Sequence, residues 1–204
     1  MSLNKDTLKN GLITVFNQMN LRSSGGIEYF ASQVSQQVAD YIKSGSVTTT
    51  DSGPISAGSF TGSGTGSVKA DSATCEAVLL VALYAMMQMP VGGDDYLATE
   101  LARGIHTMAT ESKKVETSVT GTATSGTTVT LVTGTAKGEF SGTQSTLRSA
   151  FIAAFMVMGG MYAGGNEYLA DEIAKAVTTY LKNGTISTQG EGVLSGSSGS
   201  GSIS

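Results

Sequence analysis

Three short segments of the chain place an acidic residue and a tyrosine directly after a pair of glycines. They read GGIEYFA at residues 25–31, GGDDYLA at residues 92–98 and GGNEYLA at residues 164–170. If the segments surrounded a common axis, the carboxylates of Glu28, Asp95 and Glu167 could converge on Ca²⁺, which prefers oxygen ligands. The spacing does not match an EF-hand loop, however, and an acid in the first turn of a helix usually complements the helix dipole. We therefore favour a structural role for these acids over a metal site.

Each part of the repeated segment has a structural explanation. Two glycines between helices permit positive φ and a tight reversal. An Asp or Asn after them is expected to cap the next helix by accepting bonds from free backbone N–H groups. The tyrosine is expected to pack at the start of that helix. The sequence thus predicts nine structural anchors, which are Gly25, Gly26, Tyr29, Gly92, Gly93, Tyr96, Gly164, Gly165 and Tyr168.

Other residues that could do chemistry stand alone. His106 is the one histidine, and no nucleophile or orienting group lies near it in the sequence. Cys75 is the one cysteine, in the apolar segment ATCEAVLLVAL, which predicts an inert buried thiol and no internal disulfide. The glycine-rich segment at residues 62–71 fits neither the P-loop nor the dinucleotide-binding spacing. We therefore predict no enzyme activity, no catalytic or cofactor-binding residue and no cofactor.

The elements that position these residues form three tandem units. When the tyrosines of the three segments are aligned, apolar residues recur upstream and downstream at the three- and four-residue spacing of a buried helical stripe. Each unit then closes with a Ser/Thr/Gly-rich stretch in which Val and Thr alternate as in strands. The predicted fold class is α+β, with units at residues 1–70, 71–142 and 143–204, each a helical hairpin followed by a β-hairpin or extended arm.

One helical hairpin cannot cover its own apolar face, so we expect the units to pack together as one domain. Three units could form a closed bundle with pseudo-threefold symmetry or a short open row. The first helices of the second and third units, AVLLVALYAMMQM and AFIAAFMVMGGMY, are apolar nearly all round and are predicted to lie centrally. The corresponding helix of the first unit contains Asn10 and Asn17 and should be more exposed. Gly45 and Gly184 are expected as helix C-caps.

Two arrangements of the arms are open from the sequence. The interleaved Thr and Val of residues 46–68 and 117–140 indicate strands that pair rather than flexible linkers. They could pair among the three arms of one chain. They could also pair with a neighbouring subunit by strand addition.

The composition limits the classes of partner that the chain is expected to bind. Charged residues make up 14% of the chain, against about a quarter in typical soluble domains, which suggests that much of the surface lies against other protein. A net charge of -4 with scattered basic residues argues against nucleic acid. The apolar stretches at residues 73–89 and 150–163 are too short to span a membrane. The segment MSLNKDTLKN has no apolar core, so we expect no signal peptide and synthesis in a reducing cytoplasm.

Four segments of the chain resemble small structural proteins of tailed bacteriophage virions. They are LKNGLITVFNQM (residues 8–19), ASQVSQQVADYIKSGSVTTT (residues 31–50), TGSGTGSV (residues 61–68) and GSSGSGSIS (residues 196–204). The resemblance implies a non-enzymatic role in capsid decoration, neck, tail or baseplate, with other virion proteins and copies of the chain as partners. It also implies that the chain is made in the cytoplasm of a bacterial host and ends up in the virion. It transfers no catalytic or binding residue. The alternative is a receptor- or glycan-binding adhesion module, for which the aromatic content of 6% is low.

Overall fold

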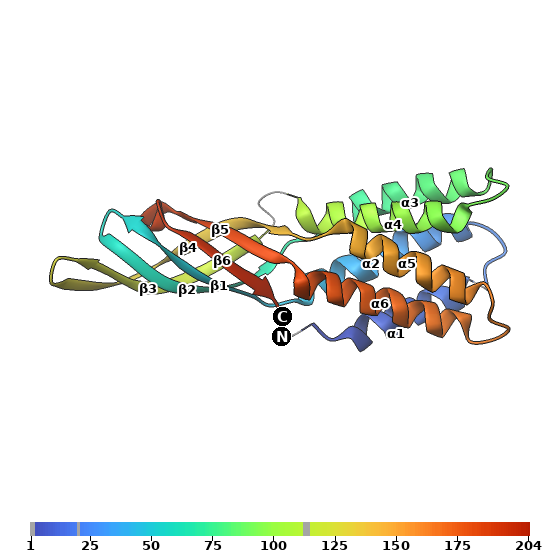
Figure 1. The fold of residues 1–204 in the computed structure, drawn as a ribbon, viewed down its shortest axis with the longest axis horizontal. Coiled ribbons are helices and arrows are strands. Elements are labelled where there is room, and N and C mark those ends of the chain that lie inside the picture. The colour runs from blue at the N-terminus through green and yellow to red at the C-terminus, as the bar shows by residue number, and fades with distance from the viewer. Residues whose placement is uncertain (1–2, 20, 112–114) are drawn as a thin grey trace.

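The computed structural model describes residues 3–19, 21–111 and 115–204, which form an elongated molecule with helices at one end and strands at the other (Figure 1). The chain is α+β, as predicted. Along the sequence, two helices are followed by two strands, and this order occurs three times. Both termini lie at the junction of the two halves (Figure 1).

Within the described residues, six helices form a closed ring in which each helix packs against the next and the last returns to the first. In each hairpin, the second helix has seven buried residues and the first has four. The helices are α1 (Lys5–Met19), α2 (Gly26–Ser44), α3 (Ser72–Met86), α4 (Gly93–Thr110), α5 (Gln144–Met158) and α6 (Gly165–Asn183).

The prediction that the most apolar helices lie centrally is wrong. On α3, Val81 is 66% exposed, and on α5, Met156 is 72% exposed. The second helices occupy the more buried places because small residues such as Ala39, Ala102 and Ala174, all fully buried, let neighbouring helices approach closely. The first helices touch the core along one stripe only, so their remaining apolar residues face outward.

The strands form one closed antiparallel barrel in the order β1 to β6, with β6 pairing back to β1. Of the two arrangements left open by the sequence, the arms therefore pair with one another. The strands are β1 (Val47–Ile55), β2 (Gly58–Val68), β3 (Val115–Ser125), β4 (Thr128–Ser141), β5 (Thr185–Glu191) and β6 (Ser198–Ile203), and a 3₁₀ turn, η1 (Gly192–Leu194), lies between the last two.

The glycine content of the arms follows from how tightly the strands pack. At Gly66, Gly138 and Gly201, a Cβ atom would lie 1.9, 1.8 and 1.8 Å from a carbonyl oxygen of the adjacent strand. No side chain fits at such a distance, since even close Cβ contacts are longer than 3 Å. The alternation of glycine with Ser and Thr is thus a requirement of the closed barrel and not the signature of a flexible linker.

The barrel interior is layered. Residues at its base, including Val47, Val115 and Ile186, belong to the core shared with the helices. A separate apolar cluster of Phe60, Val119, Ala136 and Leu194 fills the far part. A polar layer of buried side chains, Thr49, Asp51, Thr117 and Thr188, lies in the same barrel.

Gly45 and Gly184 do cap α2 and α6, but for a different reason than expected. Both have extended conformations, with φ of -68° and -76°, which any residue could adopt. A Cβ at Gly184 would lie 1.9 Å from the Phe140 ring, and one at Gly45 would lie 2.6 Å from Ile203. Space at the helix-to-strand junction, rather than a left-handed turn, explains these glycines.

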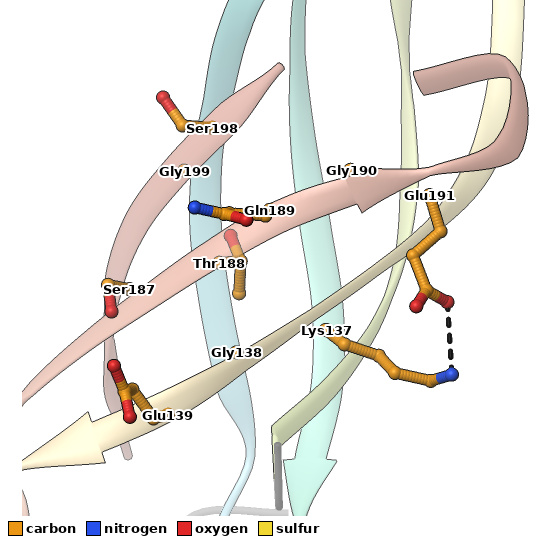
Figure 2. A pocket seen from close by; sticks show the side chains of 10 residues that line it. All are labelled: Lys137, Gly138, Glu139, Ser187, Thr188, Gln189, Gly190, Glu191, Ser198 and Gly199. Atoms are coloured by element: carbon orange, nitrogen blue, oxygen red, sulfur yellow. Dashed lines mark ion pairs between the residues drawn. The ribbon is translucent and has the colours of Figure 1, made fainter. Parts of the chain in front are cut away.

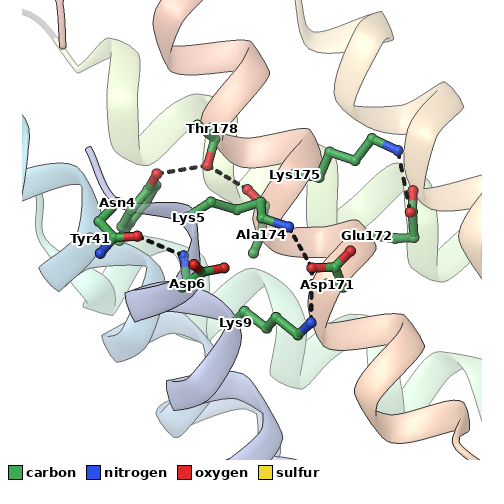
Figure 3. Close-up of polar contacts among 10 residues, drawn as sticks. All are labelled: Asn4, Lys5, Asp6, Lys9, Tyr41, Asp171, Glu172, Ala174, Lys175 and Thr178. Carbon is green, nitrogen blue, oxygen red and sulfur yellow. Dashed lines mark hydrogen bonds and ion pairs between the residues drawn. The ribbon is translucent and has the colours of Figure 1, made fainter. Parts of the chain in front are cut away.

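Contacts between the first and last elements close both halves of the molecule. Asp171 of α6 binds the amines of Lys5 at 2.6 Å and Lys9 at 3.2 Å on α1 (Figure 3). The hydrogen bond from Lys5 lowers the pKa of the Asp171 carboxyl. In the barrel, Ser46 and Ser204 exchange two backbone hydrogen bonds of 2.9 Å. Contacts between the two ends of the chain therefore close both the helical ring and the barrel.

Candidate interaction surface

The glycine pairs make the reversals between the two helices of each hairpin. Gly25, Gly92 and Gly164 have φ of 67°, 80° and 76°, and each is the N-cap of the following helix. The expectation that an Asp or Asn side chain caps these helices is wrong, because the cap residue is the glycine itself and makes no side-chain bond. The acids lie in the first turn, where they complement the helix dipole.

Polar residues next to the anchors make contacts at the seams between neighbouring hairpins. Glu28 of α2 accepts a hydrogen bond from the Tyr84 hydroxyl of α3. That bond lowers the pKa of Glu28 and raises the pKa of Tyr84. Asp95 of α4 binds Arg148 of α5 at 2.6 Å.

At the remaining seam, Asn166 of α6 donates to Asn17 of α1 at 3.2 Å. A polar residue one or two positions after each glycine pair therefore joins its hairpin to a neighbouring one around the ring. The anchor tyrosines are half-buried at the same level, and Tyr29 packs under the guanidinium of Arg22, 3.7 Å from the ring centre.

The metal candidates do not converge. Glu28 and Asp95 lie at different seams with different partners, and Glu167 is exposed. Within residues 3–19, 21–111 and 115–204, no group of three or more His, Cys, Asp or Glu residues could hold a metal ion.

His106 has a structural partner. Its Nδ1 atom lies 2.8 Å from the hydroxyl of Tyr180, which joins α4 to α6. Burial lowers the pKa of His106 and raises the pKa of Tyr180. The pair is held between helices by packing of Tyr180 on Phe140, with ring centres 5.4 Å apart. This geometry favours a structural role in which His106 and Tyr180 connect α4 and α6 to Phe140 of β4 at the base of the barrel.

Cys75 lies fully buried on α3, as the sequence predicts. Burial raises the pKa of its thiol to about 11, so the reactive thiolate is scarce at neutral pH. Gly104 of α4 packs against it, since a Cβ there would lie 2.9 Å from the sulfur. The cysteine serves close helix packing.

Asp51 is a buried acid that sequence reasoning missed. It lies inside the barrel with no exposed surface and accepts hydrogen bonds from Thr49 at 2.7 Å and Thr188 at 2.9 Å. The alternation of β1 could have found it, because Asp51 shares its face with Val47 and Thr49. Two hydroxyl donors satisfy the carboxylate oxygens in a space that a glycine, Gly199, leaves open.

The surface hollows on the barrel are polar. One of them, of about 580 Å³, runs over β4, β5 and β6 and is lined by Ser, Thr and Gly together with Lys137, Glu139, Gln189 and Glu191 (Figure 2). Lys137 and Glu191 form an ion pair of 3.1 Å across it. A groove of this kind offers hydrogen-bond donors and acceptors to a partner.

Large exposed apolar side chains are the more distinctive feature of the surface. They include Val81 and Tyr84 on α3 and Met156 and Val157 on α5. We call the outward sides of these two helices together the outer-helix face. More of them lie in and beside the loops that join the helices of each hairpin, at the end far from the barrel (Figure 1). These distal-loop residues are Leu21, Met87, Met89, Val91, Met161 and Tyr162.

The outer face of α1 differs at the aligned positions. Where α3 has Val81 and Tyr84, α1 has the exposed polar residues Thr14 and Asn17. Folding alone does not require exposed apolar residues on two of the three first helices. Exposed apolar patches commonly mark contact sites. The arrangement is suited to binding other protein surfaces.

Comparison with known proteins gives no relative: no family model, no curated protein and no solved structure matches the chain. In the parts of the chain that the structure describes, none of the helices combines the length and the apolar character needed to cross a membrane.

Proposed function

We propose that the chain is a non-enzymatic structural component of a bacteriophage virion, in capsid decoration, neck, tail or baseplate. It would assemble with other virion proteins and copies of itself through its helical surface and its strands. The observation that carries the proposal is the outer-helix face, where Val81 and Met156 are exposed on a folded chain with few surface charges. The phage assignment rests on the resemblance of residues 8–19, 31–50, 61–68 and 196–204 to small virion proteins.

As part of this proposal, residues 1–70, 71–142 and 143–204 are three copies of one unit arranged with pseudo-threefold symmetry. The strand register supports this arrangement. Within the successive strand pairs, Val47 lies opposite Gly66, Val115 opposite Gly138, and Ile186 opposite Gly201. Between them, Val68 lies opposite Val115, Phe140 opposite Ile186, and Ile203 opposite Val47.

The test asks whether the protein is present in particles and whether the outer-helix face holds it there. Particles of the phage that encodes the chain are purified on a density gradient and analysed by mass spectrometry, with wild-type or variant protein supplied. We expect wild-type protein at a constant copy number and loss of the Val81→Lys variant from particles. Thr14→Lys on α1 is the matched control and should be incorporated normally.

Absence of the wild-type chain from purified particles would overturn the virion role. If the purified chain then bound host cells or a glycan surface, the adhesion alternative would replace it. Equal incorporation of both lysine variants would keep the virion role but remove the outer-helix face as the contact.

A further inference from the structure

The three strand pairs of the barrel differ in length, and the shortest leaves its neighbours partly uncovered. β5 pairs with β4 only from Thr135 to Ser141, and β6 pairs with β1 only from Val47 to Ser52. Beyond these ladders, β1 continues to Ile55, and β4 begins at Thr128. Two stretches of strand therefore extend past the closed part of the barrel.

The extension of β1 is protected. Pro54 has no N–H group to offer to another strand, and proline is a common device for blocking a sheet edge. The chain before β6 also packs against it, since a Cβ at Gly196 would lie 2.3 Å from the carbonyl oxygen of Pro54. This edge cannot accept a further strand.

The extension of β4 lacks both protections. Residues 128–133 pair with β3 on one side, and no second strand among the described residues pairs with them on the other. The 3₁₀ turn packs against Gly134, where a Cβ would lie 2.9 Å from Leu194, and adds no strand beside residues 128–133. In Figure 1 the β3–β4 hairpin projects beyond the rest of the barrel. Alternate residues of such an edge direct N–H and C=O groups outward, ready to pair.

The side chains of this hairpin are also unusual for a free edge. Val129 is 65% exposed and Leu131 is 71% exposed, and both lie on the outer face of β4. Residues 117–136 contain no proline and no charged residue. Open strand edges usually carry charged residues, lysine above all, which prevent pairing with another chain. Nothing in this stretch opposes pairing.

We propose that residues 128–133 of β4 form an antiparallel, twofold strand pair with the same residues of a second copy of the chain. A twofold contact places the residue at its centre opposite the same residue of the second copy, so a charge there would meet a like charge. Because residues 117–136 carry no charge, no like-charge repulsion opposes this contact. In the register centred on Leu131, this residue lies opposite Leu131 of the second copy, and Val129 lies opposite Thr133. The inference deepens the proposed function by naming one assembly contact between copies.

Self-association of the full-length purified chain tests the contact by sedimentation equilibrium up to about 1 mM, because one short strand pair buries less surface than a stable dimer interface. We expect a reversible monomer–dimer equilibrium for the wild type. Leu131→Lys and Leu131→Glu should each weaken dimerisation at least about tenfold by like-charge repulsion. An equal mixture of the two variants should restore a mixed dimer.

Thr14→Lys on α1, which is exposed, distant from the hairpin and outside the outer-helix face, is the matched control and should leave dimerisation unchanged. Circular dichroism confirms that each variant is folded. A wild type that stays monomeric at the highest concentration overturns the proposal, as does a dimer that both Leu131 variants leave intact. This measurement needs no particle, so its failure would not affect the virion role, and absence from virions would not affect the strand contact.

Discussion

The barrel and the helical ring use their apolar and polar residues in opposite ways. The barrel is built from glycine, serine and threonine, yet its strands approach so closely that glycines such as Gly138 have no room for a side chain. The helices are rich in Leu, Met and Phe, yet α3 and α5 leave Val81 and Met156 exposed. The barrel, whose composition resembles that of a linker, is thus the half in which the residue types are restricted most by close packing. The half that resembles a core has apolar surface left for contacts.

The difference has a physical origin. A narrow closed barrel has little volume per residue, so backbone proximity selects glycine and small side chains, and backbone hydrogen bonds supply most of the order. A ring of helices encloses more volume but leaves half of each outer helix outside it. Composition therefore does not indicate which half is packed more closely, whereas the space around the glycines of the barrel does.

The largest effect is expected from a side chain placed in the barrel wall. Gly138→Val should prevent the barrel from closing or cost on the order of 3 kcal/mol or more, because its Cβ would meet the carbonyl of Ser187 at 1.8 Å. Thr135→Val, on the outer face of the same strand, is the control and should change stability by less than about 0.5 kcal/mol. Urea unfolding followed by circular dichroism gives both values. Similar midpoints for the two variants would contradict the close packing of the wall.

Two positions on α5 sharpen the contrast within the helical ring. Phe151 is fully buried, so Phe151→Ala should lower the free energy of unfolding by about 3–5 kcal/mol through lost burial and a cavity. Met156 is exposed on the same helix, and Met156→Ala should cost less than about 0.5 kcal/mol. Thermal unfolding compares the two. A large loss at Met156 would mean that the outer-helix face is needed for folding.

Asp51 tests how the polar layer contributes to the barrel. Asp51→Ala should lower stability by about 1–3 kcal/mol, because it leaves the buried hydroxyls of Thr49 and Thr188 without their acceptor. Asp51→Asn keeps an acceptor oxygen and should lose less. Chemical unfolding measures the difference between the two variants. Equal stability of Asp51→Ala and wild type would show that the hydroxyls find other partners.

The smallest effect concerns His106 and pH. Burial lowers its pKa in the folded chain below the value near 6.5 that the unfolded chain keeps. As pH falls through 6.5, the unfolded state therefore gains a proton before the folded state does, and stability declines until the folded pKa is passed. The urea midpoint should drop between pH 7.5 and pH 5.5, and His106→Gln should reduce that drop. An unchanged drop in the variant would assign the pH dependence to other groups.

The sequence was informative where short-range patterns carry the structure. The aligned glycine–tyrosine segments predicted the helix pairs, and the alternation of Val and Thr predicted strands. The position of α3 and α5 could not be read in this way, because an apolar helix predicts burial without saying how much partner surface exists. Gly45 and Gly184 were placed correctly for the wrong reason, since the clash with Ile203 or Phe140 depends on residues distant in sequence.

The candidate interaction surface was less predictable. The bare edge of β4 depends on how far β5 extends, and strand lengths are set by the whole barrel. Asp51 was visible as one inward-facing position on β1, but its partner Thr188 lies on the penultimate strand. Pairings of this range follow from tertiary structure only.

The sealing of both halves by their first and last elements also constrains how the molecule is made. β1 finds one of its two neighbours in β6, and α1 finds one of its neighbours in α6, so neither ring can close until the C-terminal unit has been synthesised. Contacts between such distant parts of a chain form slowly because of the entropy of closing a long loop. During that interval the first hairpin has apolar surface without its final partner. The polar outer face of α1, with Thr14 and Asn17, adds no further apolar surface to the chain during that interval, when exposed apolar surface favours aggregation.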